Sequence, residues 1–184
     1  MSNVRCHEML PVQLQAVFDS YFGYLKEKGL DWVPVTVPAD MVSGKPDGEF
    51  VQWHPVTSRV TAAELREAGA TLGATLSPQY SAILQYKHFM ELAVGDLGFF
   101  AHPSTGWQQV LATHVFQGHP RELLLDKGFL PFANCGDWGL YCFRLAERRT
   151  DGEYLVFRWD HDDPQQFEQV ASDLYSALLQ LHAP

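Results

Sequence analysis

FLPFANCGDWGLYCFRLAERRTDGEYLVFRW, residues 129–159, contains the most regular β pattern of the chain. Aromatic and β-branched residues alternate along it, and glycine or charged residues interrupt it twice. Apolar side chains occupy both faces of the middle strand, because Tyr141 and Phe143 fall on one face and Leu140 and Cys142 on the other. A sheet covered at least in part on both sides is therefore expected. The predicted strands are 129–133, 140–145 and 154–159.

Helices are predicted before and after this region. Thr61 and Glu64 have the spacing of a capping box, and Ser77-Pro78 combines a serine N-cap with proline at the first helical position. Apolar residues recur every three or four positions at both ends of the chain. The predicted helices are 10–28 with Gly29 as C-cap, 61–70, 77–92 and 163–182, with one or two turns at 120–128. The run WQQVLATHVF, residues 107–116, is predicted to be a strand.

Composition and charge indicate a globular protein with an acidic surface. Hydrophobic residues make up 46% and charged residues 19% of the 184, which fits one domain with a real core rather than a disordered chain. Thirteen basic against 22 acidic residues give a net charge of −9, which argues against direct nucleic-acid binding and favours a basic partner. The three cysteines are too few and too scattered for a disulfide framework or a repeated zinc motif. No signal peptide or membrane-spanning segment is recognised, so a cytoplasmic location is expected.

The segment FRWDHDDP, residues 157–164, concentrates charge at the end of the last predicted strand. Carboxylates and imidazole bind metals and transfer protons, so a metal or catalytic site is one interpretation. Successive strand residues point to opposite faces, however, and no further ligands follow at a recognisable spacing. The favoured interpretation is a strand ending at Trp159 and a helix beginning with Asp163 as N-cap and Pro164 at its first position. No metal and no cofactor are predicted.

The turn ANCGDWG, residues 133–139, carries two further candidates. Cys135 is a conceivable nucleophile with His161 as base and Asp137 as orienting residue, although a small cysteine in a turn is commoner. Trp138 is typical either of a binding hot spot or of a ring that folds over a sheet edge. The predicted partner-binding residues are Asp137, Trp138, Asp160, Asp162 and Asp163.

Several short motifs occur in the order typical of one superfamily over about residues 61–182. A glutamate-bearing helix leads into Leu-Gly and a Leu-to-Tyr helix, then an apolar-Pro-apolar strand, a Gly-Asp turn and a strand ending in Trp-Asp. The proline of the second helix lies one position late, and residues 1–60 have no counterpart. The matching residues are Glu64, Leu65, Leu72, Gly73, Leu76, Tyr80, Leu130, Pro131, Phe132, Ala133, Gly136, Asp137, Tyr141, Cys142, Leu145, Val156, Trp159 and Asp160.

In these motifs the chain resembles the SUKH superfamily, which groups a fungal cell-wall assembly regulator with many bacterial immunity proteins. The resemblance implies an α+β fold, a single domain over 1–184 with a mostly antiparallel or mixed twisted sheet and helices packed around it. It also implies a non-catalytic protein that binds a cognate toxin domain, for which a basic nuclease is the partner that the charge favours. A scaffold or regulator of another protein is the alternative, and a hydrolase using Cys135 or the 160–163 cluster is a further one. Oligomeric state is left open.

Overall fold

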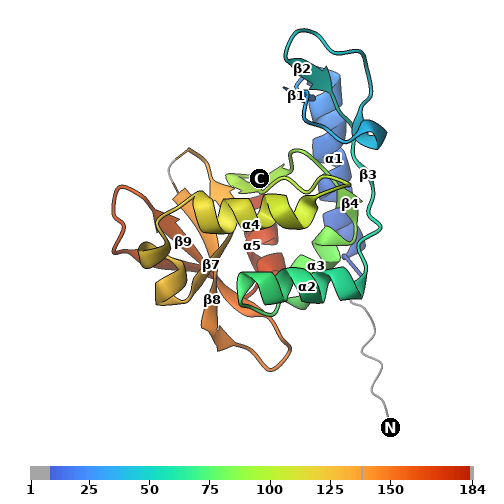
Figure 1. Cartoon of the computed structure of the whole chain (residues 1–184). Coiled ribbons are helices and arrows are strands. Elements are labelled where there is room, and N and C mark those ends of the chain that lie inside the picture. The colour runs from blue at the N-terminus through green and yellow to red at the C-terminus, as the bar shows by residue number, and fades with distance from the viewer. Residues whose placement is uncertain (1–8, 138, 183–184) are drawn as a thin grey trace.

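The centre of the fold is a six-stranded antiparallel sheet with the strand order β10-β9-β8-β7-β6-β5. We describe it from a computed structural model, in which residues 9–137 and 139–182 are placed (Figure 1). The three longest strands come from the 129–159 region, as predicted, so neighbours in sequence are neighbours in the sheet. The strands are β5 Ala93–Val94, β6 Leu97–Phe99, β7 Phe129–Cys135, β8 Gly139–Arg148, β9 Tyr154–Asp160 and β10 Phe167–Ala171.

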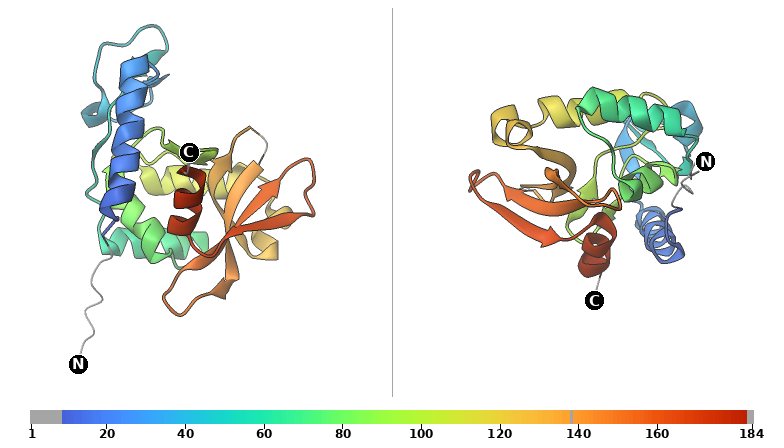
Figure 2. Two further views of the ribbon diagram at one scale, coloured as in Figure 1. Left: turned by 180° about the vertical axis from the view of Figure 1, so that it is seen from behind. Right: turned by 90° about the horizontal axis from the view of Figure 1, so that it is seen from below.

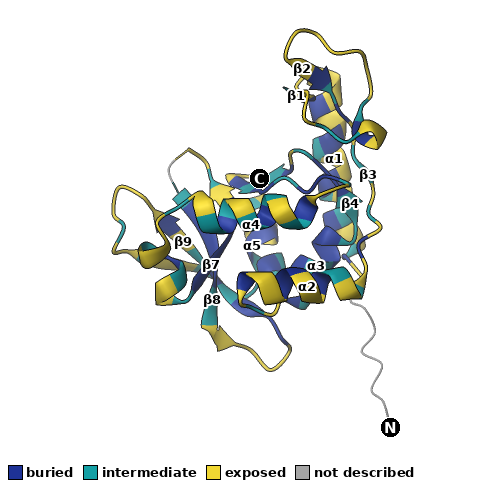
Figure 3. Ribbon diagram, in the orientation of Figure 1, coloured by how far each residue is buried: buried dark blue, intermediate teal, exposed yellow. Residues whose placement is uncertain are grey.

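Helices lie on both sides of this sheet. In the view from below, α4 and α5 are on opposite sides of it (Figure 2). The outer faces of α2 and α4 are exposed and their inner faces are buried (Figure 3). The predicted fold class, an α+β fold with a mostly antiparallel sheet, is confirmed. The α-helices are α1 Val12–Lys28, α2 Ala62–Leu72, α3 Pro78–Leu84, α4 Trp107–Gln117 and α5 Leu174–His182, and the 3-10 helices are η1 Ala39–Met41, η2 Arg121–Leu123 and η3 Leu125–Lys127.

Local capping signals are realised where the sequence predicted them. The Thr61 side chain accepts from the Glu64 amide, and Glu64 accepts in return from the Thr61 amide at 2.7 Å, which completes the capping box. The Ser77 hydroxyl accepts from the amide of Tyr80 at 3.1 Å. Gly29 ends α1 in the left-handed conformation with φ of 64°. These interactions satisfy amide and carbonyl groups that a helix end leaves without partners.

The prediction of a strand at 107–116 was wrong, because this run forms α4. Trp107, Leu111 and Val115 recur every four residues and are the buried face of the helix. Gly106 precedes the helix with φ of +69°, which glycine adopts without strain. The helix predicted at 77–92 is also shorter than expected. It ends at Leu84, and β4 (Lys87–His88) then pairs with β3 (Val56–Thr57).

The prediction that the last helix begins at Asp163-Pro164 was also wrong, because β10 comes first. Phe167 pairs with Trp159 and Glu168 with Arg158, and the Arg158 guanidinium contacts the Glu168 carboxylate at 2.6 Å. The N-cap role belongs to Asp173, whose Oδ1 accepts from the amide of Ser176 at 2.8 Å. Apolar residues continue from β10 into α5, so their spacing alone did not locate the boundary.

The N-terminal helix α1 belongs to the same hydrophobic core as the sheet. Phe18 is fully buried and meets Phe99 of β6 edge to face, with ring centroids 6.1 Å apart. The ring of Phe22 packs against those of Phe89 and Trp53, with centroid distances of 6.5 Å and 6.1 Å. After α1, strands β1 (Trp32–Pro34) and β2 (Phe50–Gln52) form a separate antiparallel ribbon beside the upper end of α1 (Figure 1). The first 60 residues therefore add a helix to the core and a ribbon outside the sheet.

A buried histidine pair lies between α3 and α4. The rings of His88 and His102 are 4.5 Å apart, and Nε2 of His102 donates to the carbonyl oxygen of Leu84 at 2.8 Å. Burial lowers the pKa of His102 to about 3, and the neighbouring His88 adds to the effect. His102 is thus a neutral part of the core at neutral pH, with its proton on Nε2.

We expect the His102 environment to make the fold sensitive to acid. The unfolded chain takes up a proton at His102 near pH 6.5 while the folded chain does not, so stability is lost as pH falls below 6.5. The free energy of unfolding should fall by about 2 kcal/mol between pH 7 and pH 5 from this group. Urea unfolding at a series of pH values measures it. The His102→Gln variant keeps a donor for Leu84, and an unchanged pH dependence in this variant would contradict the assignment.

We expect α1 to be part of the cooperative fold. Phe18→Ala should lower the free energy of unfolding by about 3–5 kcal/mol, because it removes a fully buried ring. Tyr24→Ala on the exposed face of the same helix should change it by less than about 0.5 kcal/mol. Denaturant unfolding followed by tryptophan fluorescence measures both. Equal, small effects would show that α1 is not coupled to the sheet.

Candidate protein-binding site

The turn between β7 and β8 is shaped by two glycines. Gly136 has φ of +53°, and its amide donates to the carbonyl oxygen of Asp96 at 2.9 Å. Gly139 pairs with Asp160 across the sheet, and a Cβ at position 139 would collide with the carbonyl oxygen of Trp159. Because no side chain separates the two strands here, the turn lies directly beside the end of β9. This contact brings Asp137 next to the segment that begins at Asp160.

Four of the five predicted partner-binding residues are therefore gathered at one end of the sheet. We call Asp137, Asp160, Asp162 and Asp163 the acidic rim; all four are exposed. Oδ1 of Asp160 accepts from the amide of Asp162 at 2.9 Å, which folds the chain back after β9. Nε2 of His161 lies 3.3 Å from Oδ1 of Asp162. The fifth residue, Trp138, lies outside the described residues.

Asp137 is the member of the acidic rim that lines a neighbouring hollow of about 370 Å³. The indole of Trp159 is buried, and its Nε1 donates to the carbonyl oxygen of Pro164 at 3.3 Å, which holds the 160–164 segment over the strand end. Asp137 and His161 stand at the edge of the hollow. Polar edges around an apolar centre are typical of surfaces that bind proteins. Its apolar walls are formed by Pro120, Leu123, Leu140, Trp159 and Pro164.

The chain was also compared with known protein families. Residues 59–180 match the SMI1 / KNR4 family (SUKH-1). The chain belongs to this family. A search of curated proteins found no match. The predicted superfamily is thereby confirmed over two-thirds of the chain.

The residues matched by the SUKH-1 family correspond to a definite set of helices and strands. It includes the whole six-stranded sheet and the acidic rim, and it ends within α5. The elements α1, β1, β2 and β3 lie before the matched residues. SUKH-1 membership supports a role in protein interaction or regulation, without naming the partner. No helix among residues 9–137 and 139–182 is long and apolar enough to cross a membrane.

Cys135 does not have the surroundings of an activated nucleophile. Its thiol donates to Oδ2 of Asp96 at 3.4 Å, and Tyr141 donates to the other oxygen of Asp96 at 2.7 Å. Burial, followed by the hydrogen bond to Asp96, raises the pKa of the Cys135 thiol, which disfavours the reactive thiolate. Asn134 lines the hollow, so Cys135, the next residue along the strand, points to the opposite face of the sheet from His161.

The described residues contain no group of three or more His, Cys, Asp or Glu side chains arranged to hold a metal ion. The acidic rim is instead spread along a turn and a loop, with its carboxylates facing solvent. Its arrangement suits contact with a positively charged surface better than coordination of one ion.

A second, larger hollow was not predicted from the sequence. It has a volume of about 1290 Å³ and lies between α2 and the loop that joins β8 to β9. Its residues come from positions 62 to 85 and 148 to 151, so no single sequence motif contains them. The signal in the sequence that could have indicated this hollow is the set of small residues on one face of the helix predicted at 61–70, because small side chains leave room beside a helix.

We expect Gly139 to be required for the shape of the acidic rim. Gly139→Ala should lower the free energy of unfolding by about 1–3 kcal/mol, because the added methyl group collides with the backbone of Trp159. Gly98→Ala in β6 is the matched control, since the nearest atom to its added Cβ is 4.0 Å away. Thermal unfolding measures both variants. An equal loss in the two would show that the close approach at Gly139 carries no special cost.

Proposed function

We propose that this protein is an immunity protein, which binds a cognate toxin domain and blocks its activity in the cytoplasm. SUKH-1 membership supports a protein-binding role, and the resemblance to the bacterial immunity proteins of the superfamily supplies the kind of partner. The observation that carries the proposal is the pairing of Gly139 with Asp160, which places Asp137 beside the segment of Asp160, Asp162 and Asp163 and next to a hollow with apolar walls.

The charge of this surface favours a basic partner. The chain has a net charge of −9, and four of its exposed carboxylates are gathered in the acidic rim. A domain that cleaves nucleic acid needs a positive cleft for the phosphate backbone. An acidic protein is attracted to such a cleft and competes with the nucleic acid for it. A nuclease toxin is therefore the partner that we propose.

The hollow offers the apolar contact that a tight complex needs in addition to charge. Exposed ion pairs contribute little affinity, since water screens them and side chains lose freedom on pairing. Residues that fill an apolar pocket dominate the binding energy of most interfaces. The hollow between Leu123, Leu140 and Trp159 is a receptor for one such side chain of the partner. The acidic rim then speeds association and orients the partner, while the hollow contributes to residence time.

The two alternatives have less support. A hydrolase based on Cys135 needs a thiolate close to a base, whereas the Cys135 thiol has a raised pKa and faces away from His161. A regulator of another cellular protein uses the same kind of surface, so it differs only in the identity of the partner. The experiment below separates a toxin from such a partner.

The test is rescue from the toxin domain encoded next to this gene. The neighbouring reading frame is cloned, its C-terminal domain is expressed in a sensitive host, and growth is scored with and without this protein. We expect growth only when both are present. Lack of rescue together with lack of binding to that domain would contradict the immunity role, and stable binding to a non-toxic neighbour would establish the regulator instead.

Neutralising the acidic rim should weaken binding about tenfold or more, mainly through slower association. The quadruple variant Asp137→Asn, Asp160→Asn, Asp162→Asn and Asp163→Asn is suitable, because asparagine at 160 keeps the oxygen that accepts from the amide of Asp162. Surface plasmon resonance at two salt concentrations measures both rates. A matched control removes the same charge from exposed residues elsewhere and should bind normally; it carries Glu27→Gln, Asp47→Asn, Glu49→Gln and Glu67→Gln. Equal losses in both would assign the effect to net charge alone.

A further inference from the structure

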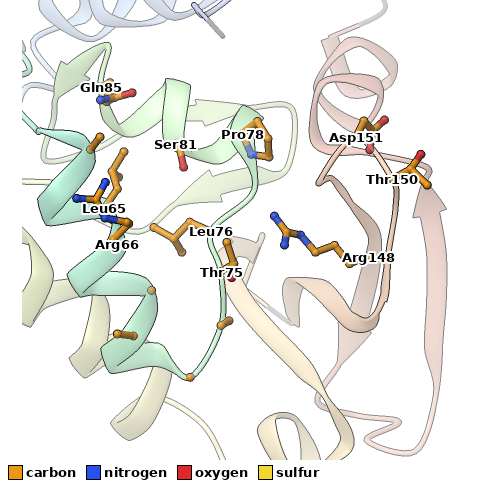
Figure 4. Close-up of a pocket in the computed structure, with 15 residues that line it drawn as sticks. Leu65, Arg66, Thr75, Leu76, Pro78, Ser81, Gln85, Arg148, Thr150 and Asp151 are labelled. Carbon is orange, nitrogen blue, oxygen red and sulfur yellow. The ribbon is translucent and has the colours of Figure 1, made fainter. Parts of the chain in front are cut away.

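The larger hollow is a groove at the opposite end of the β8–β9 hairpin from the acidic rim. The rim adjoins Gly139 and Asp160, whereas the groove adjoins the loop after Arg148 (Figure 4). Ten residues of extended strand span roughly 30 Å, so the two sites are well separated. The groove volume of about 1290 Å³ exceeds the range of roughly 300–1,000 Å³ typical of small-molecule sites. It has room for a segment of polypeptide.

The floor of the groove is made of small and apolar residues. Gly69 is buried, and a Cβ there would lie 2.6 Å from the carbonyl oxygen of Ala74, so α2 and the following loop pack together without side chains between them. Leu65 and Leu76 supply buried apolar surface. The hydroxyl-bearing residues Thr75 and Ser81 also line the groove (Figure 4). An extended chain fits a floor of this kind, because its backbone can approach closely and still find polar partners.

The charge of the groove is opposite to that of the chain. Arg66 from α2 and Arg148 from the hairpin line it, and the Arg148 guanidinium points from the hairpin toward the Thr75–Leu76 segment (Figure 4). Within residues 9–137 and 139–182, neither arginine forms an ion pair with a carboxylate. Nε of Arg148 donates to the carbonyl oxygen of Gly152 at 3.2 Å, and the guanidinium lies 5.7 Å from the centroid of the Tyr154 ring. These contacts hold the side chain in place through Nε and the face of the guanidinium, whereas a carboxylate would bind the terminal N–H groups at its edge.

The one carboxylate among the described lining residues does not cancel this charge. Oδ2 of Asp151 contacts the guanidinium of Arg149 at 2.8 Å, and Oδ1 accepts from the amide of Glu153 at 3.1 Å. Arg149 does not line the groove, and its second partner is Asp173 at 3.4 Å. Both oxygens of Asp151 are thus engaged, while the two groove arginines remain available on a protein that carries a net charge of −9.

We propose that this groove binds an extended, acidic segment of a protein partner, with Arg66 and Arg148 each contacting a carboxylate. Arginine is suited to this role because its planar guanidinium forms paired hydrogen bonds with a carboxylate. The volume of the groove, and the origin of its two arginines on different elements, α2 and the hairpin, favour a chain with several carboxylates over a single small anion. The acidic rim and the groove then select opposite charges at opposite ends of one hairpin, so the inference stands independently of the immunity role.

The test is a titration with three blocked hexapeptides in which glycine alternates with glutamate, glutamine or lysine. Two-dimensional NMR of the ¹⁵N-labelled protein follows the amides of Gly69 and Gly73 and the Nε–H of Arg148. We expect the glutamate peptide to shift these signals at concentrations about tenfold lower than the glutamine peptide needs, and the lysine peptide to leave them in place. Equal effects of the glutamate and glutamine peptides would overturn the proposal, as would the same shifts from inorganic phosphate at the same concentration.

Arg66→Gln and Arg148→Gln should each weaken binding of the glutamate peptide about tenfold, as expected for the loss of a charge-assisted hydrogen bond. Arg121→Gln removes the same charge outside the groove and should have no effect. A second pair tests the groove without changing charge. Ala70→Trp, at an exposed lining position of α2, should fill the groove and abolish the shifts, whereas Thr71→Trp on the same helix should not. Retained binding in Ala70→Trp, or an equal loss in Arg121→Gln, would place the peptide elsewhere.

Discussion

The stacking of Phe132 on Phe143 is the contact on which the rest of the structure depends. These rings belong to the adjacent strands β7 and β8, and their centroids are 4.1 Å apart. The ring of Tyr80 on α3 packs against both, with centroid distances of 5.8 Å to Phe132 and 5.6 Å to Phe143. The ring of Phe99 lies 6.2 Å from that of Phe132, again between centroids. Through Phe99 the aromatic contacts reach Phe18 on α1. One continuous set of rings therefore joins the sheet to α3, which lies within the matched family region, and to α1, which lies before it, and it gives the two hollows a common rigid base.

Local interactions made much of this fold predictable from sequence. The capping box at Thr61 and the helix start at Ser77-Pro78 depend only on residues within one turn. The strands β7, β8 and β9 are joined by short connections, so their pairing could be expected from their order in the sequence. The predictions for two segments were wrong, because tertiary contacts decided the structure there. The run at α4 contains β-branched residues that favour strands, yet its four-residue spacing matched the buried face of a helix. The segment at β10 had helical spacing, yet pairing with β9 and the cap at Asp173 determined its structure.

The two candidate sites also differ in how far they could be predicted from local sequence. The grouping of Asp160, Asp162 and Asp163 was predictable because they lie within one short segment of sequence, whereas the closeness of Asp137 to them required the pairing of Gly139 with Asp160. The cap assigned to Asp163 was wrong, which leaves its side chain exposed in the loop between β9 and β10. The groove was not predictable, because Arg66 and Arg148 lie far apart in the sequence and line one groove only when the hairpin folds against α3. Gly152 is the point of that contact, beside Pro78.

The turn at Gly139 has a consequence for how this protein can change over evolutionary time. The side chains of Asp137, Asp160, Asp162 and Asp163 project into solvent from a backbone that is fixed by Gly136, Gly139 and the indole of Trp159. Substitutions at Asp137, Asp162 and Asp163 change the charge of this surface at little cost to folding, whereas substitutions at the anchoring positions, or loss of the acceptor at Asp160, disturb the backbone itself. The chemistry of this surface is thus encoded separately from foldability. Under the proposed function, a lineage would follow a partner that diversifies by replacing one surface side chain at a time.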